Sequence, residues 1–296
     1  MEFQNACKEK RLLINETLTR LMAKRSDCPS LIVKAMEYSL LAVGKRLRPI
    51  LLLSANELVA DNSDACLNMA CAIEMIHAYS LIHDDLPAMD DDDYRRGIPS
   101  NHKVFGEALA ILAGDGLLNL AYEVMLEKCP NDPKRQFGYI KAMSVIASAA
   151  GISGMVGGQV VDMESENSDV QDDTLSYIHK HKTEALITAA LHAGVLVHTT
   201  DIKVIEPVIS YGKAIGMAFQ ITDDILDVTG DMSHLGKSTG SDAKKGKLTF
   251  PSRFGLDASR KMAEQYIDQA IASIDSFHNK GKFLKQLAIS ILVRDN

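Results

Sequence analysis

Two short segments of the sequence concentrate aspartates in a way that could bind divalent cations. Residues 83–97, HDDLPAMDDDDYRRG, place six aspartates within ten positions and follow them with Arg95 and Arg96. Residues 219–227, FQITDDILD, contain a second Asp-Asp pair. Hard cations such as Mg²⁺ prefer carboxylate oxygens, and they would offset the repulsion between these side chains. The alternative is that each run is a solvated acidic surface.

The spacing of the aspartates favours metal binding in both segments. An ideal helix would place Asp84 and Asp90 on different faces, but Pro87 should end the helix near Asp85 and let the chain bring Asp90 back. In the second segment the acidic and amide side chains fall at i, i+3, i+4 and i+7, so they can share one helix face: Gln220, Asp223, Asp224 and Asp227. The apolar residues around this face make a plain surface stripe less favourable.

Two other ligand-binding motifs do not fit. An EF-hand loop needs Gly at its sixth position, where counting from Asp90 or Asp91 gives Arg95 or Arg96. The sequence GKST at 236–239 resembles the end of a P-loop, but the first Gly of that motif would be Asp231.

Cationic side chains lie near both acidic segments in the sequence. GKRLRP at 44–49 supplies Lys45, Arg46 and Arg48, whereas Lys182, Lys237 and Lys247 lie before or after the second segment. His77 lies seven residues before Asp84, hence on the same helix face and about 10 Å away along the axis. Arginine suits bidentate diphosphate binding. We therefore expect two acidic helix ends, facing each other across a shared cavity and surrounded by cations, that bind two diphosphates through several Mg²⁺ ions.

Composition narrows the class of protein. The 296 residues are 46% hydrophobic, contain no Trp, and carry a net charge of −7, so nucleic acid is not an expected partner. Five cysteines without C-x-x-C spacing argue against disulfides or a zinc knot and fit a reducing cytoplasm. The N-terminal residues do not read as a signal peptide, and no apolar run approaches the roughly 20 residues of a spanning helix. We expect a soluble protein.

Helical periodicity covers almost the whole chain and predicts an all-α protein. The expected helices are approximately 5–24, 29–43, 46–60, 63–85, 103–112, 114–128, 133–149, 152–163, 173–199, 203–228, 256–277 and 281–294. The glycine-rich residues 151–158 fit close helix packing as well as ligand approach. No Ser/Gly/Pro-rich linker interrupts the chain, so we predict one domain over residues 1–296. The longest irregular stretches, 86–102 and 229–250, each directly follow an Asp-Asp pair, and such loops often carry function.

Five motifs together resemble a known family. GKRLRP, DDLPAMDDDDYRRG, HKTEAL, FQITDDILD and LGKSTGSDAKKGKLTFP are similar, in this order, to motifs of the trans-polyprenyl diphosphate synthases, in particular the bacterial farnesyl diphosphate synthases. The resemblance runs from about residue 30 to the C-terminus. It implies an all-α barrel around a deep central cavity, usually a homodimer, that condenses isopentenyl diphosphate with dimethylallyl or geranyl diphosphate.

The resemblance also assigns roles to residues. Three Mg²⁺ ions per active site are implied, held by Asp84, Asp90 and Asp223, with Asp85, Asp224 and Asp227 as further candidate ligands. The implied allylic diphosphate ligands are Arg95, Lys182, Lys237 and Lys247, and those of isopentenyl diphosphate are Gly44, Lys45, Arg48, His77 and Arg96. Thr183 and Gln220 correspond to groups beside the allylic carbocation. Asp84, Asp90, Lys182, Thr183, Gln220 and Asp223 are thus the candidate catalytic residues.

The resemblance leaves chain length and class alternatives open. Tyr79, five residues before Asp84, resembles the bulky stop of farnesyl-making members; it would close the pocket from one side, with Ser80 beneath the aspartate leaving room. A geranylgeranyl diphosphate synthase or a non-catalytic partner subunit of a prenyl synthase are the alternatives. A terpene cyclase has no reason to keep the isopentenyl motif. Three positions, Val43, Glu184 and Phe250, depart from the usual pattern without removing a diphosphate ligand.

Overall fold

The structure is a computed structural model that describes residues 1–61, 64–165, 172–229 and 249–293. Most of the described residues are helical, and the strands found among them are two short ones that form a single antiparallel ribbon. The predicted all-α class is confirmed. Two predicted diphosphate ligands, Lys237 and Lys247, lie outside the described residues.

The contacts of the chain group into two compact units, which are described separately. The first comprises Met1–Leu53 and Asn62–Pro133, and the second comprises Ser54–Asp61 and Lys134–Asn296. The single domain over residues 1–296 stays a prediction.

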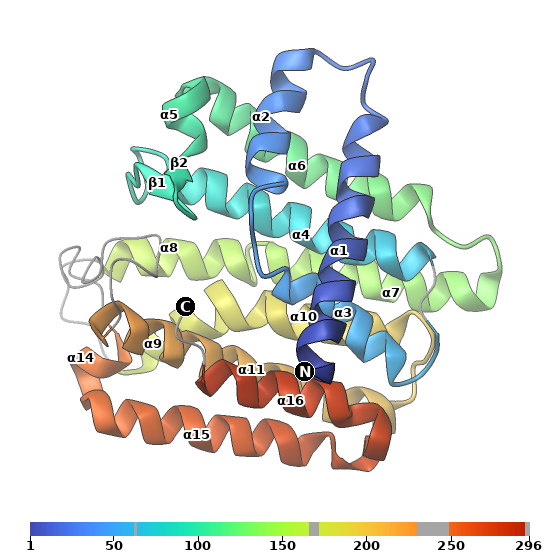
Figure 1. Ribbon diagram of the computed structural model, residues 1–296, viewed down its shortest axis with the longest axis vertical. Helices are drawn as coiled ribbons and strands as arrows, with labels where there is room; N and C mark the ends of the chain where they lie inside the picture. Colours follow the sequence, from blue (N-terminus) through green and yellow to red (C-terminus); the bar gives the residue numbers. More distant parts are fainter. Residues whose placement is uncertain (62–63, 166–171, 230–248, 294–296) are drawn as a thin grey trace. The chain divides into compact units, whose positions relative to one another are not determined.

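The first unit is built around one largely buried helix, α4 (Figure 1). Its elements, together with the helix α3 that continues into the second unit, are α1 (Glu2–Ala23), α2 (Ser30–Leu40), α3 (Leu47–Glu57), α4 (Asp64–Asp84), β1 (Tyr94–Arg95), β2 (Ile98–Pro99), α5 (Asn101–Phe105) and α6 (Glu107–Glu127). Because α4 is apolar around most of its circumference, it is buried on nearly every side and packs closely along α6. The first acidic segment begins where this core helix ends.

The break between α5 and α6 lies at a different residue from the one expected. The sequence predicts helices 103–112 and 114–128, but the break lies at Gly106, whose φ of +84° favours glycine. Gly114 instead lies within α6, where an added Cβ would be 2.1 Å from Nε2 of His83. That glycine therefore serves close packing against α4 and does not interrupt the helix.

The second unit consists of helices only, among the residues described (Figure 1). They are α7 (Pro133–Ala150), α8 (Met155–Ser165), α9 (Asp172–Ile178), the π-helix η1 (His179–Glu184), α10 (Ala185–Leu196), α11 (Ile202–Thr229), α14 (Phe250–Phe254), α15 (Leu256–Ser273), the 3-10 helix η2 (Asp275–Gly281) and α16 (Lys282–Leu292). The long helix α11 packs against α10 and α15, and the second acidic segment lies in its last turns.

The predicted helix 173–199 is not uniform. Its middle turn, His179–Glu184, is a π-helix that contains most of the HKTEAL motif. Such turns are rare and are found frequently at functional sites. Gly158 of α8 packs against this turn, since an added Cβ would lie 2.3 Å from the backbone N of Lys182. Close helix packing therefore accounts for this glycine of the 151–158 segment.

Three helical stretches have the length and apolar composition needed to cross a membrane, namely Asp64–Asp84, Glu107–Glu127 and Pro133–Ser165. The expectation that no apolar stretch reaches this length was too strict. The most apolar part of α4 is 78% buried inside the protein, which fits a core helix. The absence of a membrane span stays a prediction.

Candidate active site

The first acidic segment forms a closed turn at the end of α4. The backbone N–H of Asp90 donates to the carbonyl oxygen of Asp84 at 2.8 Å, and the carbonyl of Leu86 accepts from Met89 and Asp91. Asp84 and Asp90 are both partly exposed. The predicted return of Asp90 to Asp84 after Pro87 is thus confirmed, and the turn joins the two aspartates by a backbone hydrogen bond.

Asp85 differs from its neighbour because it is buried. Its carboxylate is 2% exposed and accepts hydrogen bonds from two nitrogens of Arg95, with Nε at 2.8 Å. The same guanidinium donates to Asp92 at 3.3 Å. Arg95 is therefore held against the acidic turn by two aspartates, and Asp85 fixes the position of a predicted diphosphate ligand.

A small β-ribbon, which the sequence analysis did not anticipate, carries both arginines. Strands β1 and β2 pair Tyr94 with Pro99 and Arg95 with Ile98. The two connecting residues, Arg96 and Gly97, have φ of +54° and +79°, as in the two-residue turns that suit the twist of a hairpin. The ribbon thereby places Arg96 at its tip, directly after Arg95.

The tip of the ribbon lies against the segment that follows α2. A Cβ added to Gly44 would be 2.7 Å from Nη1 of Arg96, so only glycine leaves the guanidinium in this place. The sequence predicts Gly44 as the end of a helix, but α2 ends at Leu40. Gly44 and Arg96, both expected to bind isopentenyl diphosphate, are thus neighbours.

Arg46 is buried and anchors this segment, whereas Lys45 and Arg48 are more exposed. Its Nη1 donates to Glu74 at 2.8 Å, and both side chains are buried. Its Nε and Nη2 donate to Asn15 and to the carbonyl of Ala42. Because every part of the guanidinium has an acceptor, this buried ion pair is well compensated. Lys45, by contrast, is exposed, and Arg48 is partly buried.

His77 is neutral in this surrounding. Burial lowers its pKa well below the usual value, and the nearby charges of Arg48, Arg96, Arg95 and Arg46 lower it further. The positive charges of Arg48, Arg95 and Arg96 thus oppose a further positive charge on His77, and all four residues belong to the first unit. A group of arginines beside a neutral histidine is suited to bind an anion such as a diphosphate.

The second acidic segment separates its aspartates by burial. Asp224 is 2% exposed, whereas Asp223 is exposed and Asp227 partly so. The Asp224 carboxylate accepts from Gln220 Nε2 at 2.8 Å and from the backbone N–H of Phe250 at 3.0 Å. Asp224 therefore ties α11 to the first turn of α14, and Asp223 and Asp227 remain accessible.

The π-helix connects to this segment through Thr183. The Thr183 hydroxyl donates to Gln220 Oε1 at 2.8 Å, so Thr183, Gln220 and Asp224 form one hydrogen-bonded chain. Lys182, the preceding residue of the π-helix, forms an ion pair with Asp162 of α8, with Nζ and Oδ2 2.5 Å apart. The structure thus brings Lys182, Thr183, Gln220 and Asp224 onto adjacent elements.

Sequence reasoning missed His179, which lies beside Asp224. Its ring is 6% exposed and stacks on Phe250 with centroids 5.1 Å apart. Burial lowers its pKa to about 4, so the ring is neutral where its Nε2 comes within 3.9 Å of Asp224. The only signal in the sequence was its place at the start of HKHKTE. Asp162, the partner of Lys182, gave no signal.

The two residues expected to set product length lie in α4. Tyr79 is 7% exposed and meets His83 edge-to-face at 5.8 Å. Burial raises its pKa to about 12, with further contributions from Tyr122 and Asp84. Ser80 is partly buried and its hydroxyl donates to the His77 carbonyl at 2.9 Å. Tyr79 is therefore a buried, neutral ring on the helix that ends in the acidic turn.

Comparison with known proteins identifies the family. The polyprenyl synthetase family model matches residues 29–287. The chain belongs to the polyprenyl synthetase family. Members of this family are prenyltransferases of isoprenoid biosynthesis, and the family resemblance expected from the motifs is confirmed.

Relatives with different product names are similarly close. A geranylgeranyl diphosphate synthase of Cyanophora paradoxa is 43% identical over 97% of this chain and 95% of its own. A farnesyl diphosphate synthase of Geobacillus stearothermophilus is 40% identical over 97% and 96%. A crystal structure of a geranyltransferase from Legionella pneumophila covers 100% of this chain and 98% of its own, at 34% identity and a TM-score of 0.87. The helical isoprenoid-synthase fold is thus confirmed.

Proposed function

We propose that the protein is a short-chain trans-prenyltransferase that condenses isopentenyl diphosphate with dimethylallyl and geranyl diphosphate to make farnesyl diphosphate. The observation that carries this proposal is the turn that joins Asp84 to Asp90, with Arg95 held against it by Asp85 and Arg96 directly after it beside Gly44. One unit thereby offers both an anion site and a carboxylate pair. The family membership supports the same reading.

The donor set of the acidic turn fits Mg²⁺. Asp84 and Asp90 are partly exposed carboxylates joined through their backbones, and Mg²⁺ commonly takes one or two carboxylates together with substrate phosphates. We assign Asp84, Asp90 and Asp223 as the ligands of three ions, with Asp227 as a further accessible candidate. When bound, Mg²⁺ offsets the negative charge that builds on a departing diphosphate.

The buried aspartates have a different proposed task. Asp85 and Asp224 are both 2% exposed and hold other residues of the site, namely Arg95 and Gln220. We therefore propose that they position ligands. Neither needs to reach a metal for this role.

The cationic and polar side chains are assigned to the two substrates. Arg95 and Lys182, with Lys237 and Lys247, would bind the allylic diphosphate and stabilise it as its C–O bond breaks. Gly44, Lys45, Arg48, His77 and Arg96 would bind isopentenyl diphosphate, whose double bond attacks C1 of the allylic cation. Proton loss to the released diphosphate then completes the product. His77, being neutral, can donate one hydrogen bond without adding a charge to the arginine group.

We propose that the hydroxyl of Thr183 and the amide oxygen of Gln220 stabilise the allylic cation. Their mutual hydrogen bond at 2.8 Å fixes the Gln220 oxygen, and Asp224 fixes its nitrogen. Oxygen dipoles held in this way stabilise positive charge without having to reorient during the reaction.

A product assay tests the activity. Purified protein is incubated with Mg²⁺, isopentenyl diphosphate and an allylic diphosphate of five, ten or fifteen carbons, and the products are sized. We expect C15 from the C5 and C10 primers and no product in excess chelator. C20 as the main product would support a geranylgeranyl diphosphate synthase, a possibility raised by the Cyanophora relative. No turnover with any primer would support a non-catalytic partner subunit.

Product length tests the role of Tyr79. Tyr79→Ala removes the buried ring and should lengthen the main product beyond C15, whereas Ser80→Ala, which removes one hydroxyl, should leave it unchanged. Radiolabelled products separated by chain length give the answer. An unchanged C15 product from Tyr79→Ala would mean that another residue closes the pocket.

We further propose a cytoplasmic homodimer. All five cysteines are free thiols, and Cys66 and Cys71 are buried, as expected in a reducing compartment. Exposed apolar side chains such as Ile111, Leu112 and Leu126 lie along α6 and could be covered by a second copy. Gel filtration with light scattering measures the mass directly.

A further inference from the structure

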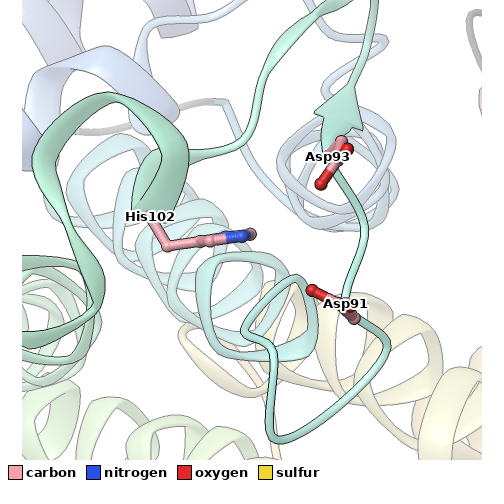
Figure 2. A group of neighbouring side chains, drawn as sticks. All are labelled: Asp91, Asp93 and His102. Atoms are coloured by element: carbon pink, nitrogen blue, oxygen red, sulfur yellow. The ribbon is translucent and has the colours of Figure 1, made fainter.

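Three side chains outside the proposed magnesium ligands converge beside the acidic turn. The ligand atoms of Asp91, Asp93 and His102 all lie within 4.8 Å of one another. Figure 2 shows the His102 ring, from α5, pointing toward the segment that carries both aspartates. Two carboxylates from one segment and one imidazole from α5 therefore meet at one place.

His102 indicates that this place binds a ligand. The residue is only 6% exposed, and neither ring nitrogen has a hydrogen-bond partner within the part of the chain that the structure describes. Buried polar groups are nearly always hydrogen-bonded, and an unsatisfied one is costly. A cation bound to one ring nitrogen would remove part of this cost.

The backbone holds the three residues in place. Asp91 has a φ of +50°, and its N–H donates to the Leu86 carbonyl at 3.1 Å. The Asp93 carbonyl accepts from the Ser100 N–H at 2.9 Å. Next to His102, the Asn101 amide donates to the Ala35 carbonyl at 2.8 Å and so ties α5 to α2. Only the exposed aspartate side chains would need to move to close the group around an ion.

We propose that Asp91, Asp93 and His102 form a binding site for one Zn²⁺ ion, separate from the proposed magnesium ligands. Imidazole favours zinc over magnesium, and carboxylate oxygens complete an N/O ligand set of the kind zinc accepts. In a tetrahedral zinc site, ligand atoms lie about 3.3 Å apart. Rotation of the aspartate side chains can reach this spacing from separations of at most 4.8 Å.

Lys103 is the natural competitor of the ion. Its Nζ lies 2.6 Å from Oδ1 of Asp93, with both side chains substantially exposed. Exposed ion pairs of this kind contribute little stability, so a divalent cation can displace the lysine. Removing the lysine should therefore tighten zinc binding, which a purely structural role of the cluster does not predict.

Calorimetric titration of the metal-free protein with Zn²⁺, in a large excess of Mg²⁺ to fill the hard carboxylate sites, tests the proposal. The wild-type chain should bind one equivalent of Zn²⁺ that both His102→Gln and the double variant Asp91→Asn with Asp93→Asn lose or bind at least tenfold more weakly. Lys103→Met should bind that equivalent more tightly. His198→Gln, which removes an exposed histidine of the other unit, is the matched control and should bind as the wild type does.

The double variant should fold normally, because both aspartates are exposed and asparagine has nearly the same shape as aspartate. A loss of zinc binding in it therefore cannot be attributed to misfolding. A thermal melt gives a second readout, because an ion that binds the folded chain raises its Tm. Zinc should raise the Tm of the wild type and of His198→Gln more than that of the double variant. Absence of zinc binding in excess Mg²⁺, or equal zinc binding by all variants, would overturn the site. Neither outcome bears on the prenyltransfer assay with Mg²⁺.

Discussion

In the first acidic segment the buried aspartate, Asp85, is held by the guanidinium of Arg95, whereas in the second the buried aspartate, Asp224, accepts from an amide and a backbone N–H. Beside each, a more accessible aspartate precedes it in the sequence, Asp84 in one and Asp223 in the other. Each segment thus has one accessible and one buried aspartate, but the donor to the buried one is charged in the first segment and neutral in the second.

The difference separates what each buried aspartate does. Asp85 neutralises a cation that is itself a predicted diphosphate ligand, so its loss would leave Arg95 partly buried without its main counter-charge. Asp224 joins two helices through neutral donors, and its loss would affect alignment more than charge balance. Variants at the four aspartates can therefore distinguish metal binding from positioning.

The largest effect should come from the accessible aspartates. Asp84→Asn and Asp223→Asn each remove a proposed metal ligand and should lower kcat by about 10²–10³-fold with little change in stability. Steady-state kinetics at saturating substrate measures this. Asp257→Asn, at an exposed position of α15, is the control. Full activity of either variant would break the proposed equivalence of the two segments.

Unfolding free energies should sharpen the comparison of the buried aspartates. Asp85→Asn breaks a buried ion pair and should cost about 3–5 kcal/mol. Asp224→Asn keeps one acceptor oxygen but replaces the other with an NH₂ group, which cannot accept a hydrogen bond. One of the two donors, Gln220 Nε2 or the Phe250 N–H, therefore loses its acceptor, which should cost about 1–3 kcal/mol. Urea denaturation of both variants gives the ranking. The reverse order would mean that the neutral donors bind their aspartate more strongly than the arginine does.

Acid should destabilise the second segment through His179. Its pKa is about 4 in the folded protein and about 6.5 when unfolded, so as pH falls the unfolded chain takes up the proton first. Stability is therefore retained above pH 6.5 and lost between about pH 6.5 and 4, by about 3 kcal/mol in all. His179→Gln should reduce this loss, as followed by urea denaturation across pH. His181→Gln, two residues further along the same π-helix, is the matched control.

The smallest effect concerns Thr183. Thr183→Val removes the hydroxyl that donates to Gln220 and should cost about 1 kcal/mol of stability, while Thr183→Ser should restore it. Because the freed amide can rotate away from the cation, kcat should also fall, with KM for isopentenyl diphosphate unchanged. A change in KM for isopentenyl diphosphate without a change in kcat would contradict the proposed role of Thr183 beside the allylic cation.

Features governed by nearby residues were predictable from the sequence. Pro87 cannot continue a helix, so the end of α4 and the return of Asp90 followed from the chain alone. The all-α class followed from periodicity, and the family from five motifs. Failures came where a residue serves a distant neighbour: Gly44 was predicted to end a helix, but it makes room for the guanidinium of Arg96.

The sequence by itself determined which residues could do the chemistry, because carboxylates, arginines and a breaking proline have the same properties in any fold. It could not show which aspartate of each pair is buried, since adjacent residues point about 100° apart on a helix and the spacing does not say which direction faces other parts of the protein. That choice depends on Arg95 and Phe250, which fold back from outside the helix to supply hydrogen-bond donors. Tertiary structure alone decided it, because a carboxylate can be buried only where the fold provides donors to replace water.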